Sequence, residues 1–202
     1  MALWLGERPL VLASKSAVRQ ALLREAGIAV EVEPADLDER ALEQGMSTRD
    51  PGAIAGLLAR EKARAVAARR PDRLVLGADQ TLALDERRFS KPADRAAARD
   101  QLRALRGRTH SLHTAVALLR GGTVLFEHRD AARLTMRAFS DEFLEAYLDA
   151  AGAAVTASVG GYQLEKVGIQ LFEHITGDHF VILGLPLMAL LHYLRQQRWL
   201  AA

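Results

Sequence analysis

The chain has 202 residues, of which 50% are hydrophobic, 26% are charged and none is cysteine. This composition is typical of a globular protein with a substantial core, and the missing thiols exclude disulfide bonds and thiolate metal sites. The net charge of +2 comes from interspersed basic and acidic residues, a pattern that favours solvated helix faces over a nucleic-acid interface. We expect a single domain over residues 1–202 and no stable complex with nucleic acid.

The beginning of the chain and its most apolar stretch predict neither export nor membrane insertion. The first residues, MALWLGERPLVLAS, lack a basic region ahead of an apolar run. The apolar stretch Phe180–Leu191 is shorter than the roughly 20 residues that cross a bilayer, and Pro186 interrupts it. We therefore expect a soluble, cytoplasmic protein without a membrane partner.

The first part of the chain predicts alternating strands and helices. PLVLAS is a short apolar strand that leads through two serines into the helical segment SAVRQALLREAG, which stops at Gly27. IAVEVE alternates as a half-buried strand does, and PADLDERALEQGMSTRD is a polar loop with room for a short helical turn. A long helix then begins after its N-cap Asp50 and ends before Pro71.

The remaining elements continue this mixed order. RLVLGAD and TLALDERRFS predict two successive strands, the second with a hairpin, and DRAAARDQLRALRG predicts a helix capped by Asp94. Residues 109–136 predict three strands, with a glycine pair turning the first two. A helix capped by Ser140, a glycine-rich loop and a closing helix near Pro186 follow. The order predicts an α/β fold with a twisted, partly antiparallel mixed sheet flanked by helices.

The segment LASKSAVR, residues 12–19, leads from a strand into a helix. Free N–H groups at the helix start, two hydroxyls and the cations Lys15 and Arg19 suit an anion such as phosphate. The same residues also suit a plain N-cap by Ser14 or Ser16, and on this segment alone the cap is favoured. Neither a Walker P-loop nor a G-x-G-x-x-G fingerprint occurs, so a phosphate site here is of another type.

Acidic residues at two places in the sequence are candidates for chemistry. Asp36, Asp38 and Glu39 offer hard oxygen ligands for a divalent cation, although most acidic loops bind nothing. Asp79 lies within the apolar stretch LVLGADQTLA, where a carboxylate is either buried at considerable cost or placed at a strand's C-terminal end beside a ligand. Gly77 lets another group approach the backbone closely. We predict a functional role for Asp79 at the end of its strand.

Other candidate residues give weaker signals. Lys62 and Lys91 are compatible with ordinary surface cations, although Lys91 precedes Pro92 in an extended loop. The histidines lack the H-E-x-x-H arrangement and no G-x-S-x-G elbow occurs, so zinc and a serine triad have no support in the sequence.

Several short motifs resemble, in order, those of the Maf family of nucleotide pyrophosphatases, which is related in fold to the inosine-triphosphate pyrophosphatases. They are LASKSAVR (12–19), DLDE (36–39), EKA (61–63), GADQ (77–80), SKP (90–92), GRTH (107–110) and GDHFVILGLP (177–186). Each motif is weak alone, but the ordered set covers nearly the whole chain. The resemblance implies two lobes with a central cleft.

The resemblance also implies an activity, the hydrolysis of a nucleoside triphosphate between its α and β phosphates, with Mg²⁺ or Mn²⁺ and in a homodimer. Asp79 matches the family's catalytic aspartate and would accept a proton from the attacking water or hold the metal. Glu39 would be the second carboxylate for the metal. The phosphate-binding side chains would be Ser14, Arg19, Lys62 and Lys91.

Three positions bear on the base that the chain recognises. The family's pyrimidine-directed branch looks like G-A-D-T and Y-G-I-Q-G, whereas the branch for 7-methylated guanine nucleotides has S-D-Q and a glutamate for that last glutamine. Gln80 and Glu165 match the second branch, and a carboxylate can accept from both N1–H and the exocyclic amine of guanine. Val18 stands where that branch has tryptophan, so an aromatic face for a cationic base is missing. We expect a guanine-type substrate.

Three alternative functions stay open. A pyrimidine pyrophosphatase would prefer dTTP or UTP. A non-catalytic, nucleotide-binding regulator of cell division would work through partners, and it has little need for the catalytic set of lysines and carboxylates. An RNA-binding module would carry a one-sided basic face with exposed aromatic side chains, but aromatic residues make up only 5% of the chain.

Overall fold

The structure is a computed structural model that describes residues 2–201. The strands are β1 (Leu10–Leu12), β2 (Val30–Val32), β3 (Leu74–Leu84), β4 (Arg87–Phe89), β5 (Thr109–Arg120), β6 (Thr123–Met136) and β7 (Phe172–Thr176). The α-helices are α1 (Ala17–Glu25), α2 (Glu39–Gln44), α3 (Pro51–Ala67), α4 (Arg95–Leu105), α5 (Asp141–Ala151), α6 (His179–Ile182) and α7 (Leu187–Gln196). Short 3₁₀-helices are η1 (Gly152–Thr156), η2 (Val159–Gly161) and η3 (Val167–Leu171).

The strands form a mixed sheet in the order β2-β1-β3-β5-β6-β7, with β4 paired to β3. The chain divides into two compact units. The first unit extends to Gln80 and adds Thr114–Asp130 and the segment from Gly184 onward, and the second comprises Thr81–His113 and Ala131–Leu183. The expected α/β class with a mixed sheet and flanking helices is therefore confirmed.

In the first unit, side-chain caps start the helices where the sequence predicted them. Ser16 Oγ accepts from the backbone N–H of Arg19 at 3.3 Å and caps α1. The carboxylate of Asp50 accepts from two backbone N–H groups at the start of α3, with Pro51 as the first helical residue. Gly27, with φ of +77°, follows the end of α1.

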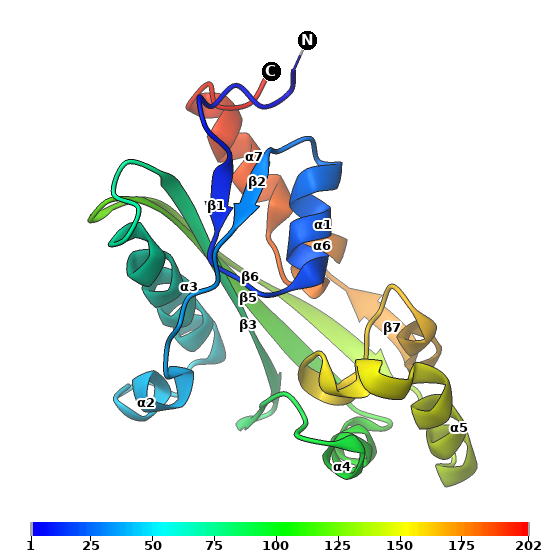
Figure 1. Cartoon of the computed structure of the whole chain (residues 1–202). Coiled ribbons are helices and arrows are strands. Elements are labelled where there is room, and N and C mark those ends of the chain that lie inside the picture. The colour runs from blue at the N-terminus through cyan, green and yellow to red at the C-terminus, as the bar shows by residue number, and fades with distance from the viewer. Residues whose placement is uncertain (1, 202) are drawn as a thin grey trace. The chain divides into compact units, whose positions relative to one another are not determined.

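The core between α3 and the strands of the first unit is built mainly from alanine and valine. β1 lies between β2 and β3 and runs parallel to both. In Figure 1, α3 lies on one side of β1 and β2, and α1 and α7 lie on the other. Because alanine dominates the face of α3 that meets the strands, the helix backbone comes close to the sheet. The core cluster here consists of Val11, Ala13, Ala55, Ala59, Ala63, Val66, Ala67, Val75, Ala115, Ala117 and Leu119.

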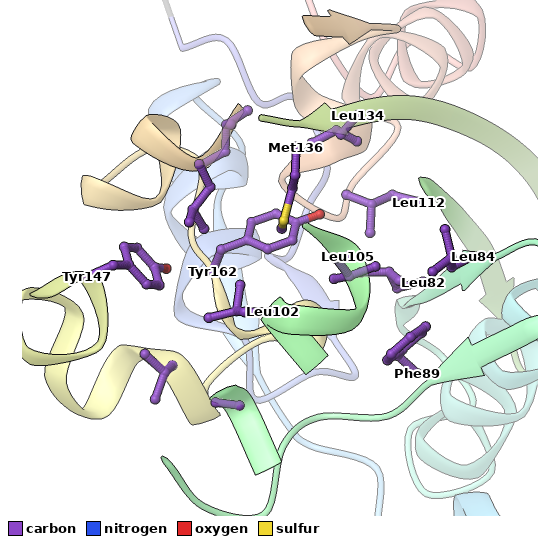
Figure 2. Packing of buried hydrophobic residues seen from close by; sticks show 14 of the residues in the cluster. Leu82, Leu84, Phe89, Leu102, Leu105, Leu112, Leu134, Met136, Tyr147 and Tyr162 are labelled. Atoms are coloured by element: carbon purple, nitrogen blue, oxygen red, sulfur yellow. The ribbon is translucent and has the colours of Figure 1, made fainter. Parts of the chain in front are cut away.

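Larger side chains fill the core of the second unit. The ring of Tyr162 packs edge-on against Phe172, with 4.8 Å between centroids. Asp94 caps α4 and Ser140 caps α5, as the sequence predicted. Figure 2 shows much of this cluster, including Leu82, Leu84, Phe89, Leu102, Leu105, Leu112, Leu134, Met136, Tyr147 and Tyr162.

Two expectations about strands were wrong, and one segment contains elements that the sequence did not predict. RLVLGAD and the TLAL part of TLALDERRFS form one strand, because β3 is buried on both faces and continues through Asp79 to Leu84, so this carboxylate lies mid-strand and not at a strand end. The hairpin expected in TLALDERRFS is confirmed, since β4 (Arg87–Phe89) pairs antiparallel with the end of β3. Residues 109–136 form two long strands and not three, since β6 continues without a turn through the polar stretch Glu127–Asp130 as far as Met136. β7 and α6 occupy a segment to which the sequence assigned no element.

Within residues 2–201, no helix combines the length and the apolarity that crossing a membrane requires.

His110 makes the second unit sensitive to acid. The side chain is 1% exposed, its Nε2 lies 2.7 Å from Tyr162 Oη, and burial lowers its pKa from 6.5 to about 4. The imidazole of His110 binds its second proton more tightly in the unfolded chain than in the folded protein. The free energy of unfolding should therefore fall by about 2 to 3 kcal/mol as the pH drops from about 6.5 towards about 4. His110→Gln should remove this part of the acid sensitivity.

Urea unfolding at about pH 7 and about pH 4.5 measures the effect. His192→Gln, at an exposed position on α7, is the matched control and should keep the wild-type pH dependence. The account would be contradicted if the free energies of unfolding of wild type and His110→Gln differed by the same amount at both pH values.

Candidate functional site

A lysine in the first unit joins two carboxylates. Lys62 on α3 donates from Nζ to Asp79 Oδ1 at 2.6 Å, and the same Nζ lies 3.0 Å from Glu39 Oε1 at the start of α2. The side chains of Lys62 and Asp79 are 12% and 11% exposed, whereas that of Glu39 is 47% exposed. The cluster is therefore buried at Asp79 and open to solvent at Glu39.

Lys62 reaches Asp79 because α3 packs tightly against β3 at Gly77. A Cβ at Gly77 would lie 2.0 Å from the carbonyl oxygen of Ala59 and 2.8 Å from the backbone nitrogen of Ala63. Only glycine fits this contact, and Lys62 lies in the same turn of α3. The expectation that Gly77 permits a close approach is confirmed, and the approaching group is the helix backbone.

Arg19 ties three segments of the first unit together beside Asp79. Its Nε donates to the carbonyl of Gly184 at 2.7 Å, and its Nη1 donates to the carbonyl of Ala78 at 2.9 Å and to Ser14 Oγ at 3.2 Å. Burial lowers the pKa of the guanidinium, and the Asp79 carboxylate opposes this shift. Nη2 makes no hydrogen bond with any residue that the structure describes, so it is the part of the fork that faces no protein acceptor.

The sequence left open whether Ser14 and Ser16 cap the helix or bind an anion, and in the structure the two side chains have different roles. Ser16 caps α1, whereas Ser14 Oγ accepts from the backbone N–H of Ser16 at 3.2 Å and from Arg19. Ser14 is 8% exposed, and because its oxygen accepts twice, its own proton is left to donate.

Two opposing influences act on the Asp79 carboxylate. Burial, the largest cause, raises its pKa, and the charges of Lys62 and Arg19 oppose this rise. A buried carboxylate with a raised pKa is a stronger base than an exposed one, and the two cations hold it in the ionised form. The arrangement suits the removal of a proton from a water molecule.

The residues expected to read the base lie in both units. Gln80 follows Asp79 on β3, and its Nε2 donates to Thr114 Oγ1 on β5 at 2.9 Å. Val18 is half-buried on α1. Thr114, which is 1% exposed, was missed, since it is 34 positions from Gln80 and belongs to no motif. Glu165 is exposed in the second unit, between η2 and η3.

The structure brings five of the expected residues together within the first unit, and these are Ser14, Arg19, Glu39, Lys62 and Asp79. Lys91 belongs to the second unit, where it is exposed shortly after β4. The Asp38 carboxylate accepts from the backbone N–H of Ala41 at 3.0 Å and caps α2. Across residues 2–201, no group of three or more acidic or histidine side chains is arranged to hold a metal ion.

The chain is similar over its whole length to known proteins. The family model "Maf-like protein" matches residues 9–197. Proteins called "Nucleoside triphosphate pyrophosphatase" include one from Rhodopseudomonas palustris (strain BisB18), 59% identical over 100% of both chains. Another, from Nitrobacter winogradskyi, is 56% identical over 99% of this chain and 98% of its own.

A solved structure, "Structure of a HAM1 protein from Coxiella burnetii", matches with 17% identity over 63% of this chain and 72% of its own, and its TM-score of 0.40 is too low to bear on function. The range that the family model matches contains every residue of the cluster around Asp79.

Proposed function

The chain belongs to the Maf-like family, and from that membership we infer that it hydrolyses nucleoside triphosphates to a nucleoside monophosphate and pyrophosphate. It is a hydrolase of the same kind as its full-length relatives, which are named nucleoside triphosphate pyrophosphatases. The observation that carries the assignment within this chain is the buried pair of Lys62 and Asp79 beside Arg19.

We assign the role of general base to Asp79. Its burial raises its pKa, and its contact with Lys62 keeps it ionised and fixed in orientation. The carboxylate takes a proton from water as the water attacks the α-phosphorus, and the bond from that phosphorus to the bridging oxygen breaks. The electrons of that bond leave with pyrophosphate.

Groups around Asp79 bind the phosphates in this proposal. Lys62 carries three donors, of which two meet carboxylates, so one is left for a phosphate oxygen. Ser14 donates its hydroxyl proton at the start of α1, where the helix also presents its positive end. Arg19 contributes Nη2 and a fixed positive charge. Lys91, from the second unit, is the remaining proposed phosphate ligand.

The donor set of the cluster fits a divalent cation. The two cations Arg19 and Lys62 balance the two carboxylates Glu39 and Asp79, so a triphosphate adds negative charge that this cluster does not offset. One or two carboxylates together with substrate phosphates are the usual ligands of Mg²⁺. We propose that Glu39 and Asp79 hold Mg²⁺ or Mn²⁺, which would supply positive charge to the phosphates and acidify a bound water.

We further propose a preference for guanine-type bases. Gln80 is held in place by Thr114, and Glu165 offers an exposed carboxylate that can accept from two donors of guanine. Thymine and uracil present only one such donor. Val18 offers no aromatic face for a methylated, cationic base, so unmethylated and methylated guanine nucleotides should be used more evenly than an aromatic residue would allow.

The expectation of a homodimer stays a prediction.

A panel of triphosphates with GTP, 7-methyl-GTP, ITP, dTTP and UTP tests this preference through the rate of pyrophosphate release with Mg²⁺ or Mn²⁺. Glu165→Gln should lower kcat/KM for the guanine nucleotides by about tenfold and change the pyrimidine rates little, since a hydrogen bond to a charged group is worth about 1.5–3 kcal/mol. Glu173→Gln, at an exposed position on β7, is the matched control.

If Glu165→Gln ranks the five triphosphates by kcat/KM in the same order as wild type, the guanine assignment is contradicted. A wild-type preference for dTTP or UTP would favour the pyrimidine alternative. Nucleotide-induced stabilisation without any turnover would identify a non-catalytic binding protein.

A further inference from the structure

A cavity lies at the end of the parallel strands of the first unit that is opposite the Asp79 cluster. It has a volume of about 550 Å³, and all of its lining residues belong to this unit. Its wall includes Pro9, which precedes β1, and Leu74, the first residue of β3. The Asp79 cluster lies towards the opposite ends of these strands, because Ser14 follows β1 and Asp79 lies five positions after Leu74 on β3. Five residues of strand span roughly 16 Å, so the cavity is separate from the Asp79 cluster.

The paired ends of the chain form one side of this cavity. Trp4 and Leu200 form an antiparallel bridge, and the backbone N–H of Leu5 donates to the carbonyl of Trp199 at 2.9 Å. Figure 1 shows the two ends together. The wall is therefore held in place by backbone contacts, and the cavity has a defined shape.

Arginine dominates the lining of the cavity, which has four arginines and two carboxylates. Arg8 is paired with Asp72, and the Nη2 of Arg73 donates to Glu31 Oε2 at 2.7 Å. The other two guanidinium groups, those of Arg120 and Arg198, form no ion pair with any carboxylate in residues 2–201. Arg120 instead lies over the ring of Trp199, 5.3 Å from its centroid. Glu7 is the remaining carboxylate, so the wall carries net positive charge.

Arg73, which also lines the cavity, carries a buried donor that no described residue satisfies. Arg73 is 9% exposed, and its Nε is buried and has no hydrogen-bond partner among the described residues. Buried donors of charged groups are rare unless an ion or a water satisfies them. Arg73 lines the same cavity as Arg120 and Arg198.

We propose that this cavity binds a phosphate group, either as free inorganic phosphate or pyrophosphate or as part of a small organic phosphate. The guanidinium fork matches the geometry of phosphate oxygens and remains charged at all relevant pH values. The volume lies within the range of small-molecule sites, and Trp199 supplies an apolar wall beside the cations. The proposal does not depend on the hydrolytic activity assigned to the Asp79 cluster.

A substitution of Arg198 can show whether this residue serves phosphate binding or the stability of the fold. Its φ is +57°, in the left-handed region that glycine adopts at little cost and other residues rarely occupy. Arg198→Gly should therefore raise the melting temperature by relieving the backbone, and at the same time weaken phosphate binding by removing a cation. A residue retained only for stability would not show these opposite effects.

The fluorescence of Trp199 reports on the cavity directly, in a Trp4→Phe background that leaves it as the only tryptophan. Inorganic phosphate, pyrophosphate and GMP are titrated separately at constant ionic strength, with chloride as the balancing anion. We expect at least one of them to give a saturable change, and the tightest of the three identifies the source of the phosphate group. The shift in melting temperature that the same anion produces is the second readout.

Arg198→Gly and Arg120→Gln should each raise the dissociation constant by about tenfold or more. Lys62→Gln in the Asp79 cluster and Arg133→Gln on the exposed part of β6 should leave it within about twofold, since a distant lost charge acts weakly through screened solvent.

No response to any of the three anions would overturn the proposal, as would a response that Arg198→Gly and Arg120→Gln leave unchanged. A response that Lys62→Gln abolishes would assign the binding to the Asp79 cluster instead.

Discussion

Asp79→Asn should lower the rate of pyrophosphate release by about 10²- to 10⁴-fold, which is the range that a positioned general base contributes. Asparagine keeps the shape of the side chain, but it cannot take a proton from water and is a poorer ligand for a cation. Lys62 keeps its contact with Glu39 in this variant, so the cluster loses its base without losing all of its ion pairing. The rate is measured with saturating nucleotide and metal.

Asp85→Asn is the matched control for this variant. Asp85 lies in the turn between β3 and β4 with φ of +52°, a conformation that asparagine tolerates well, and its partner Arg108 is exposed. The control should keep the wild-type rate. Equal rates for wild type and Asp79→Asn, in proteins with the same melting temperature, would remove Asp79 from the mechanism.

Gly77→Ala should be the most damaging single-methyl change in the first unit. The added Cβ would lie 2.0 Å from the carbonyl oxygen of Ala59, and the obstacle is helix backbone that cannot rotate away. Overpacking in a close-packed core costs about 1–3 kcal/mol, and this contact should reach the upper end of that range. If α3 moves to relieve the clash, Lys62 moves with it, and a shift of about 1 Å can cost about 10²-fold in rate.

Gly122→Ala provides the control for this change, because a Cβ there would meet nothing within 4 Å. Chemical unfolding and pyrophosphate release are measured on both variants. Wild-type stability in Gly77→Ala would show that α3 does not depend on this contact, and wild-type activity in a destabilised Gly77→Ala would show that the position of Lys62 is not set by it.

Local signals in the sequence were sufficient for the helix starts and for the chemistry of single residues. Asp50, Asp94 and Ser140 cap the helices that they were expected to cap, because a cap depends only on a residue and its next few neighbours. Gly77 was expected to permit a close approach for a similar reason. The ordered motifs predicted the family without any knowledge of how they meet in space.

Contacts between distant segments could not be predicted in the same way. Asp79 was placed at a strand end because a lone carboxylate in an apolar run resembles a boundary, whereas β3 accommodates it mid-strand by pairing it with Lys62. The acceptors for Arg19 include the carbonyl of Gly184, which is 165 positions away and carries no side chain to signal its role. The bond from Gln80 to Thr114 likewise depends on how β3 and β5 are aligned.

The central claim is that water, activated beside Asp79, attacks the α-phosphorus of a nucleoside triphosphate. Hydrolysis in water enriched in the heavy oxygen isotope, with both products analysed by mass spectrometry, tests it most directly. The account predicts equal amounts of monophosphate and pyrophosphate, with the heavy oxygen in the monophosphate alone. Heavy oxygen in pyrophosphate, or products that are a nucleoside diphosphate and inorganic phosphate, would contradict it.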